Sequence, residues 1–70
     1  MKITAHIREA VIKDKALSVD AHNAKIVTIN GVVTLRGPVE TQAESEKLQK
    51  ICTETPNVVQ VDNQLEIKAP

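Results

Sequence analysis

The stretch Lys25-Ile26-Val27-Thr28-Ile29-Asn30-Gly31-Val32-Val33-Thr34-Leu35 decides the fold of this 70-residue chain. Two runs rich in β-branched residues flank the pair Asn30-Gly31. A two-residue type I′ turn needs a positive φ at both central residues, and Asn-Gly tolerates that backbone best. The stretch therefore predicts a β-hairpin that extends from about Ala24 to Arg36.

The turn also predicts which side chains share a face, because it places Ile29 opposite Val32 and so fixes the register. Side chains alternate between the two faces of a strand. One face of the hairpin then carries Ile26, Thr28, Val33 and Leu35, and the other carries Val27, Ile29, Val32 and Thr34. We expect Gly37-Pro38 to break the second strand. Gly31 and Gly37 lie on either side of that strand, so they serve its turn and its exit and do not form a phosphate-binding loop.

A helical pattern precedes the hairpin. Apolar residues at Ile3, Ile7, Ala10 and Val11 recur at helical spacing and predict a helix from about Ile3 to Lys13. The connector from Asp14 to Asn23 has weak periodicity. We expect Leu17 and Val19 to anchor it to the core.

A second helix is predicted after the hairpin, beginning at Thr41. The run Thr41-Gln42-Ala43-Glu44 has the form of a capping box, in which Glu44 reaches back to the Thr41 amide. Pro56 ends this helix, because the residue before a proline is pushed out of the α region. Asn57 can then supply a left-handed turn. The expected buried stripe consists of Ala43, Leu48, Ile51 and Cys52.

The chain ends in an alternating segment, Val58 to Lys68, that predicts a strand with one buried face. Asn63 falls on the buried face, where its amide is expected to satisfy backbone groups near a helix end or the connector. The element order is α-β-β-α-β. It predicts a single α+β domain over residues 1–70, with a three-stranded mixed sheet and two helices packed on one face.

Composition excludes several classes of function. The chain has no Phe, Trp or Tyr, and its nine basic residues balance nine acidic ones. Base stacking on aromatic side chains is therefore impossible, and the basic surplus typical of nucleic-acid binders is absent, so no nucleic-acid partner is expected. The single cysteine excludes an internal disulfide.

The compartment stays open between two alternatives. No apolar run approaches transmembrane length, and Met1 leads almost directly into the first helical pattern. The protein is then cytoplasmic if Met1 is the true start. Otherwise it is a domain cut from a longer exported precursor.

With these elements in order, the chain resembles the BON family of bacterial osmotically inducible and nodulation proteins. The opening pattern is Ile7-x-x-Ala10-Val11. The central pattern is Ile26-x-Thr28-x-Asn30-Gly31-x-Val33-x-Leu35-x-Gly37-x-Val39, and the closing one is Val58-x-x-Val61-x-Asn63-x-Leu65-x-Ile67. Two residues depart from the family pattern, Pro56 and an Asn57 where glycine is usual.

The resemblance implies a domain without catalytic residues or cofactors. Such domains are adaptors of the bacterial periplasm and outer membrane, associated with transport and osmotic stress. They are proposed to bind anionic phospholipid membranes or other envelope components. A small-cation role, for K⁺, is a further alternative that the resemblance implies. The oligomeric state stays open.

The first helix carries the candidate lipid-binding residues. Lys2, Arg8, Lys13 and Lys15 could contact anionic head groups, while Ile12 could insert shallowly between them. The alternative is a solvated polar face with Ile12 tucked under the connector from Asp14 to Asn23.

The outer hairpin face carries the candidate partner-binding residues Val27, Ile29 and Val32. They could dock a partner protein, a second BON-like domain or a copy of this chain. The alternative is ordinary β-propensity on a half-exposed sheet.

No metal site or nucleophile is expected. The conceivable transition-metal ligands are His6, Asp20, His22 and Cys52, which lack the close spacing of ligand pairs. Cys52 lies on the expected buried stripe, where a free thiol behaves as a small hydrophobe.

Overall fold

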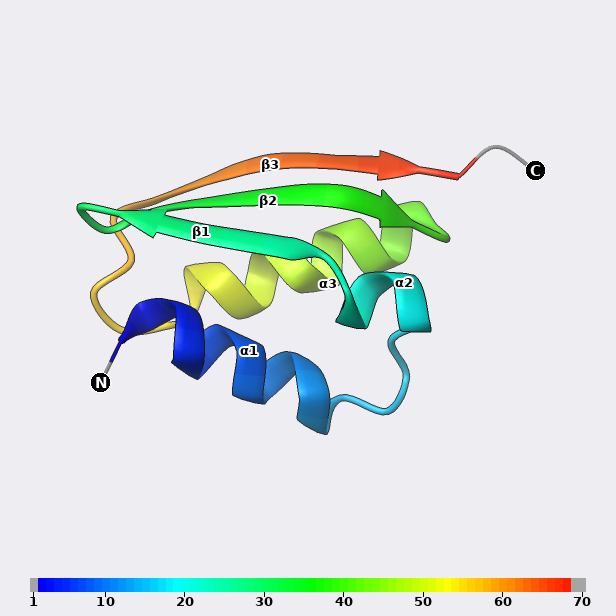
Figure 1. Cartoon of the computed structure of the whole chain (residues 1–70), viewed down its shortest axis with the longest axis horizontal. Helices are drawn as coiled ribbons and strands as arrows, with labels where there is room; N and C mark the ends of the chain where they lie inside the picture. The colour runs from blue at the N-terminus through cyan, green and yellow to red at the C-terminus, as the bar shows by residue number, and fades with distance from the viewer. Residues whose placement is uncertain (1, 69–70) are drawn as a thin grey trace.

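The computed structural model describes residues 2–68 and contains six elements. They are α1 (Ile3–Lys13), α2 (Val19–His22), β1 (Lys25–Ile29), β2 (Val32–Val39), α3 (Gln42–Thr53) and β3 (Gln60–Ile67) (Figure 1). The predicted α+β class and all five predicted elements are confirmed. The structure adds one short helix, α2, within the connector.

The hairpin has the predicted register. Ile29 pairs with Val32, and the antiparallel ladder continues to Lys25 and Arg36. Asn30 has φ 50° and Gly31 has φ 82°, as a type I′ turn requires.

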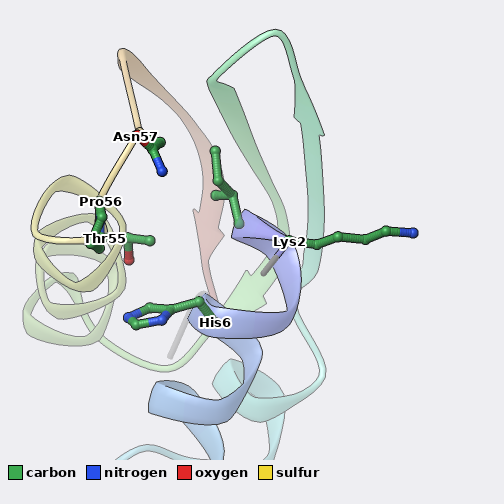
Figure 2. Close-up of a pocket in the computed structure, with 6 residues that line it drawn as sticks. Lys2, His6, Thr55, Pro56 and Asn57 are labelled. Carbon is green, nitrogen blue, oxygen red and sulfur yellow. The ribbon is translucent and has the colours of Figure 1, made fainter.

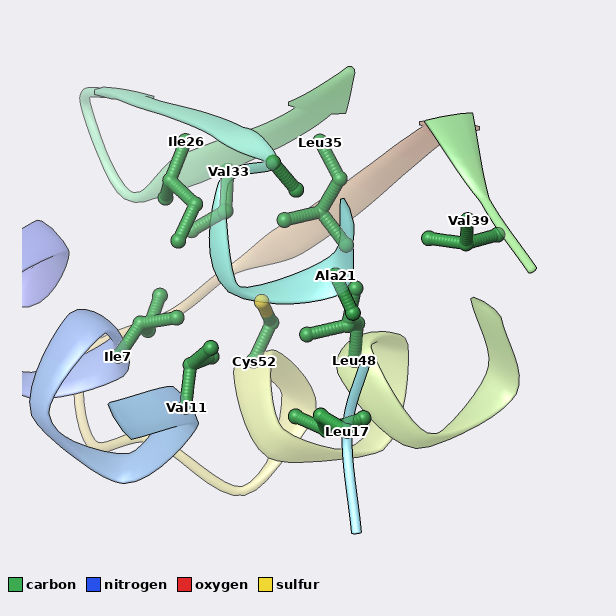
Figure 3. Close-up of a cluster of buried hydrophobic side chains, with 11 residues drawn as sticks. Ile7, Val11, Leu17, Ala21, Ile26, Val33, Leu35, Val39, Leu48 and Cys52 are labelled. Carbon is green, nitrogen blue, oxygen red and sulfur yellow. The ribbon is translucent and has the colours of Figure 1, made fainter. Parts of the chain in front are cut away.

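The sheet is mixed, with strand order β1-β2-β3. β2 and β3 run parallel, with α3 as the crossover between them. The helices lie together on one side of the sheet (Figure 1). There Ile7 and Val11 from α1 and Leu48 from α3 meet Val33 and Leu35 from β2 (Figure 3). None of these five core side chains is more than 1% exposed.

β2 continues through Gly37-Pro38, so the prediction that this pair breaks the strand was wrong. The Val39 carbonyl accepts the Lys68 amide at 2.8 Å, which turns the odd-numbered backbone groups of β2 toward β3. Pro38 therefore faces the β1 side, where the ladder has already ended at Arg36. A missing N–H leaves no ladder bond unmade at that position. Gly37 accommodates the bend with φ 122°.

The connector is anchored by Leu17 as predicted, but Val19 is 74% exposed and was wrongly assigned to the core. Val19 begins α2, and the buried residue of that helix is Ala21. The Ser18 hydroxyl caps α2 by accepting the Ala21 amide at 3.2 Å. Val19 and Ala21 lie 200° apart on a helix, so one faces solvent when the other faces the core.

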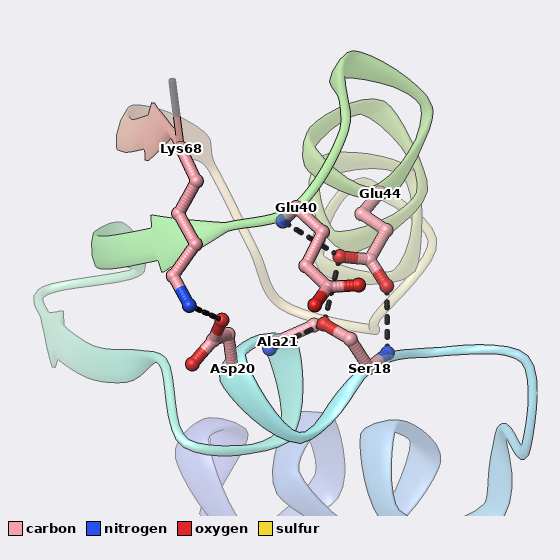
Figure 4. Close-up of polar contacts among 6 residues, drawn as sticks. All are labelled: Ser18, Asp20, Ala21, Glu40, Glu44 and Lys68. Atoms are coloured by element: carbon pink, nitrogen blue, oxygen red, sulfur yellow. Dashed lines mark hydrogen bonds and ion pairs between the residues drawn. The ribbon is translucent and has the colours of Figure 1, made fainter. Parts of the chain in front are cut away.

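α3 begins after Thr41, whose hydroxyl accepts the Glu44 amide at 3.2 Å as a cap should. The reciprocal half of the predicted capping box is wrong. The Glu44 carboxylate instead accepts the Ser18 amide, the Ser18 hydroxyl and the Glu40 amide (Figure 4). It thereby ties α3 to the connector in front of α2.

The buried stripe of α3 also differs from the prediction at one position. Ala43 is exposed, and Ser45 is buried with Leu48 and Cys52. Ser45, Leu48 and Cys52 follow the i, i+3, i+7 spacing of one helix face, whereas Ala43 lies about 140° from Leu48.

β3 is an edge strand whose inward residue Asn63 bonds to side chains of α3 and to one backbone amide of its own strand, not to the helix end or connector predicted for it. Its side-chain nitrogen donates to the Ser45 hydroxyl and to the side-chain oxygen Oε1 of Gln49, each at 3.0 Å. Its own carbonyl oxygen accepts the Leu65 amide at 3.0 Å. Because even-numbered groups of β3 bond to β2, that amide points to the open edge of the sheet.

Candidate functional site

α1 presents one face to the core and the opposite face to solvent. Ile7 and Val11 are fully buried, while Ile12 is 64% exposed. The alternative in which Ile12 is tucked under the connector was therefore wrong. A bulky aliphatic side chain stands in solvent near the end of α1, one residue before its last position at Lys13.

The structure brings only part of the predicted basic cluster together. Lys13 neighbours Ile12, and Lys15 follows in the turn after the helix. Arg8, one turn earlier, donates to the His22 carbonyl at 3.0 Å and so also braces α1 against α2. Lys2 is ten residues before Ile12, about 15 Å along the helix axis, and does not join this group.

Both acidic residues near Ile12 are engaged by lysines. Glu9 pairs with Lys13 at 2.9 Å, and Asp14 pairs with Lys47 of α3 at 2.8 Å. The hydrogen bond and charge of Lys13 lower the pKa of Glu9. Hydrogen bonds from Lys47 and from the Ala16 amide lower the pKa of Asp14. Both acids stay ionised at neutral pH, but each has a cation beside it.

A shallow cavity of about 240 Å³ lies where the start of α1 meets the segment after α3 (Figure 2). It is lined by Lys2, Ile3, His6, Thr55, Pro56 and Asn57. The Lys2 side chain extends away from His6 and Asn57 (Figure 2). The Thr55 hydroxyl is already used, since it donates to the Ile51 carbonyl at 2.8 Å. Asn57 has φ 73°, the predicted left-handed turn.

The open sheet face brings Val27, Ile29 and Val32 into one corner at the hairpin end. Val27 and Ile29 alternate along β1, and Val32 lies opposite Ile29. Ile29 is 65% exposed, and the other two are half-buried. No element among residues 2–68 packs on this face. Their role in binding a partner stays a prediction.

The four conceivable metal ligands are scattered. Asp20 pairs with Lys68 at 2.6 Å (Figure 4), and the His22 ring lies 3.1 Å from the Asp14 carbonyl. Cys52 is buried in the core, and burial raises the pKa of its thiol to about 11. Among the described residues no three His, Cys, Asp or Glu side chains gather around a possible ion.

Sequence reasoning missed two features of the surface. Val59 is 79% exposed, and a Cβ on Gly31 would lie 2.8 Å from Val59 Cγ2, so Val59 packs against the hairpin turn. Lys25 and Arg36 stand opposite each other on the open sheet face, and both are exposed. The predicted register already implied this second feature. Lys25 lies four residues before Ile29, so both side chains are on the same face of β1, and the register places Arg36 opposite Lys25.

The three helices of the described chain are all short. Among residues 2–68, no helix has both the length and the apolar composition that crossing a bilayer demands.

Comparison with known proteins gives one finding. The family model described as BON domain matches residues 2–69, which is nearly the whole chain. No curated protein matches the sequence. The elements that carry the resemblance all form, from the α1 core face to the Asn-Gly hairpin and the closing strand, and the second hairpin strand continues to Val39. With that match over almost its full length, the chain belongs to the BON domain family.

Proposed function

We propose that this BON domain is a non-catalytic binding module of the bacterial cell envelope that contacts anionic phospholipid through the C-terminal half of α1. The observation that carries the proposal is Ile12, exposed on the side of α1 that faces away from the core. An amphipathic surface helix binds a membrane by burying such a residue at the head-group boundary while cations contact phosphates.

The surrounding charges fit this role. Lys13 and Lys15 flank Ile12 in sequence, and Lys47 adds a cation from α3. The ion pair between Lys13 and Glu9 is solvent-exposed on both sides. Exposed pairs of this kind contribute little to stability, so Lys13 can exchange its carboxylate for a lipid phosphate at little cost. The Arg8 guanidinium adds a further cation one turn before Ile12, although it also donates to the His22 carbonyl.

The expected affinity is low. Each basic residue near an anionic surface contributes about 1 kcal/mol, and the effect is screened within a Debye length. A single domain with this patch therefore binds weakly, and firm attachment calls for a second domain that binds alongside it. We propose the periplasm or cell envelope as its compartment and envelope or osmotic stress as its context, on the family's association with both.

Vesicle co-sedimentation tests the lipid contact. The chain is expected to bind phosphatidylcholine vesicles that contain phosphatidylglycerol at low salt. It should not bind neutral vesicles, and it should not bind the anionic vesicles at high salt. Ile12→Asp should abolish binding, and the double change Lys13→Gln with Lys15→Gln should weaken it.

Val59→Asp is the matched control, because it places the same charge on an exposed aliphatic residue at the hairpin end of the sheet. It should bind as the unchanged chain does. Equal binding by Ile12→Asp, or no binding to anionic vesicles at low salt, rules out the proposed surface.

A further inference from the structure

The open face of the sheet has an ordered distribution of charge. The sheet register aligns its outward residues in rows across β1, β2 and β3: Ile29, Val32, Gln60; then Val27, Thr34, Asp62; then Lys25, Arg36, Gln64; and last Pro38 and Glu66 on β2 and β3 alone. Seen from the apolar corner at Ile29, the cations Lys25 and Arg36 lie farther along the strands. The nearest acid, Asp62, lies across the sheet on β3.

The two cations have no acidic partner within the described chain. Lys25 and Arg36 are a directly opposed cross-strand pair, and neither forms an ion pair with any residue from 2 to 68. Like charges in this arrangement destabilise a sheet. Asp62 and Glu66 of the same chain lie diagonal to Arg36 on β3 without pairing with it, so a carboxylate brought from outside would add to the relief of that repulsion.

We propose that two copies of this chain associate through their open sheet faces, with the strands of one copy crossing those of the other at nearly a right angle. Orthogonal stacking is one of the two ways in which sheets pack. It lays the along-strand direction of one copy over the across-strand direction of the other. The cations of each copy then approach the acid of its partner.

One two-fold operation satisfies both the apolar corner and the charges. Strands are about 4.8 Å apart, and alternate residues are about 6.8 Å apart along a strand. A two-fold axis on the diagonal through Ile29 therefore sets Ile29 on its counterpart and Val27 on the partner's Val32. The same axis brings the partner's Asp62 within roughly 5 Å of Arg36, measured in the plane of the sheet.

Aligned packing does not achieve this match. With the two-fold axis across the strands, Lys25 and Arg36 project past the partner's hairpin end. With the axis along the strands, Asp62 projects past the partner's edge. Among two-fold arrangements that stack Ile29 on its counterpart, the charge pattern therefore favours the crossed one, with a second copy as the occupant. The contact is isologous, so it closes as a dimer.

The dimer is expected to be weak. A stable interface covers about 800 Å² on each partner, roughly a sixth of the 4655 Å² that this chain exposes. A three-stranded face of this size lies at or below that limit. Its net charge of zero adds no repulsion between copies.

Sedimentation equilibrium from about 10 μM to 1 mM tests the proposal, with circular dichroism to confirm that each variant folds. The unchanged chain should show a monomer–dimer equilibrium within this range. Ile29→Asp should remove it. Arg36→Asp and Asp62→Arg should each raise the dissociation constant at least tenfold, and the two changes together should restore it.

Ile12→Asp is the control that separates this surface from the lipid contact, since it should leave dimerisation unchanged. A strict monomer at 1 mM overturns the proposal. So does a dimer that survives Ile29→Asp, which would use another surface such as the β1 edge. A charge-swapped double variant that folds but stays monomeric also overturns it.

Discussion

The carboxylate of Glu44 on α3 accepts two hydrogen bonds from Ser18 in the connector, from its amide at 2.6 Å and from its hydroxyl at 2.8 Å. The Glu40 amide donates to the same carboxylate at 3.0 Å. One side chain thus fixes the start of α3 and the cap of α2. The bonds between Ser18 and Glu44 join residues 26 apart in sequence, and they hold the N-cap residue of the short helix α2 in place.

Acid should weaken this junction. Burial raises the pKa of Glu44, but the hydrogen bonds from Glu40 and Ser18 outweigh it, and the net pKa is lower than the usual 4.5. The folded state therefore favours the ionised form. Its contribution to stability is complete above pH 4.5 and is lost as the pH falls through the folded-state pKa.

Glu44→Gln tests that prediction. We expect it to destabilise the domain by about 1 kcal/mol at pH 7, below the roughly 1.5–3 kcal/mol of a buried hydrogen bond to a charged group, because the site is only partly buried. In urea melts at pH 7 and pH 3.5, the difference between Glu44→Gln and the unchanged chain should shrink at the lower pH. Glu46→Gln, on the exposed side of the same helix, is the control. A constant difference at both pH values contradicts the role assigned to Glu44.

Gly31→Ala should destabilise the hairpin by roughly 1–3 kcal/mol. The backbone at Gly31 has φ 82°, which an alanine adopts only with strain. The added Cβ would lie 2.8 Å from Val59 Cγ2 and 3.2 Å from the Asn57 carbonyl oxygen. Adding Val59→Ala removes the side-chain collision but not the backbone strain, so the double variant should recover only part of the loss. Thermal melts measure both. Full recovery would show that the collision, and not the positive φ, sets the cost.

Leu35→Ala should leave much of the population unfolded. The side chain is fully buried at the centre of β2, and such truncations cost about 2–5 kcal/mol. A domain this small has only a few kcal/mol of stability in total. Ile67→Ala, at a position 45% exposed, should cost far less. Urea unfolding curves of the two variants that coincide would mean that Leu35 is not central to the core.

Cys52 should report on global opening. Burial raises the pKa of its thiol to about 11, so little thiolate forms at pH 8 and the sulfur is shielded. Labelling by a thiol reagent should be slow in buffer and should accelerate in step with urea unfolding followed by circular dichroism. Fast labelling of the native protein would indicate local opening of α3.

Local signals were enough to predict the elements whose cause is local. The Asn30-Gly31 pair predicted the hairpin register, and the spacing of Ile3, Ile7 and Val11 predicted both ends of α1. Asn57 predicted the left-handed turn before β3. In each case neighbouring residues determine the backbone by themselves.

The errors arose where distant residues decide. α2 depends on Ser18 and its bonds to Glu44, so the connector alone could not predict that Val19 faces solvent. Pro38 remains in a strand because β1 ends beside it, a fact of sheet topology.

The candidate surfaces divide in the same way. The register that follows from the turn brought Val27, Ile29 and Val32 together, whereas the partners of Arg8 and Lys13 and the separation of Lys2 needed the structure. Their binding roles stay predictions.

The contact between Asn63 and the Leu65 amide has a consequence for behaviour at high concentration. β3 is the longer edge of the sheet, and exposed edges nucleate intermolecular strand pairing and fibril growth. The side-chain oxygen of Asn63 already accepts the Leu65 amide, a donor that an incoming strand would need. Acidic Asp62 and Glu66 on the same strand discourage stacking of identical chains in register. This domain should therefore refold cleanly from denaturant at concentrations where an unguarded edge would seed amyloid.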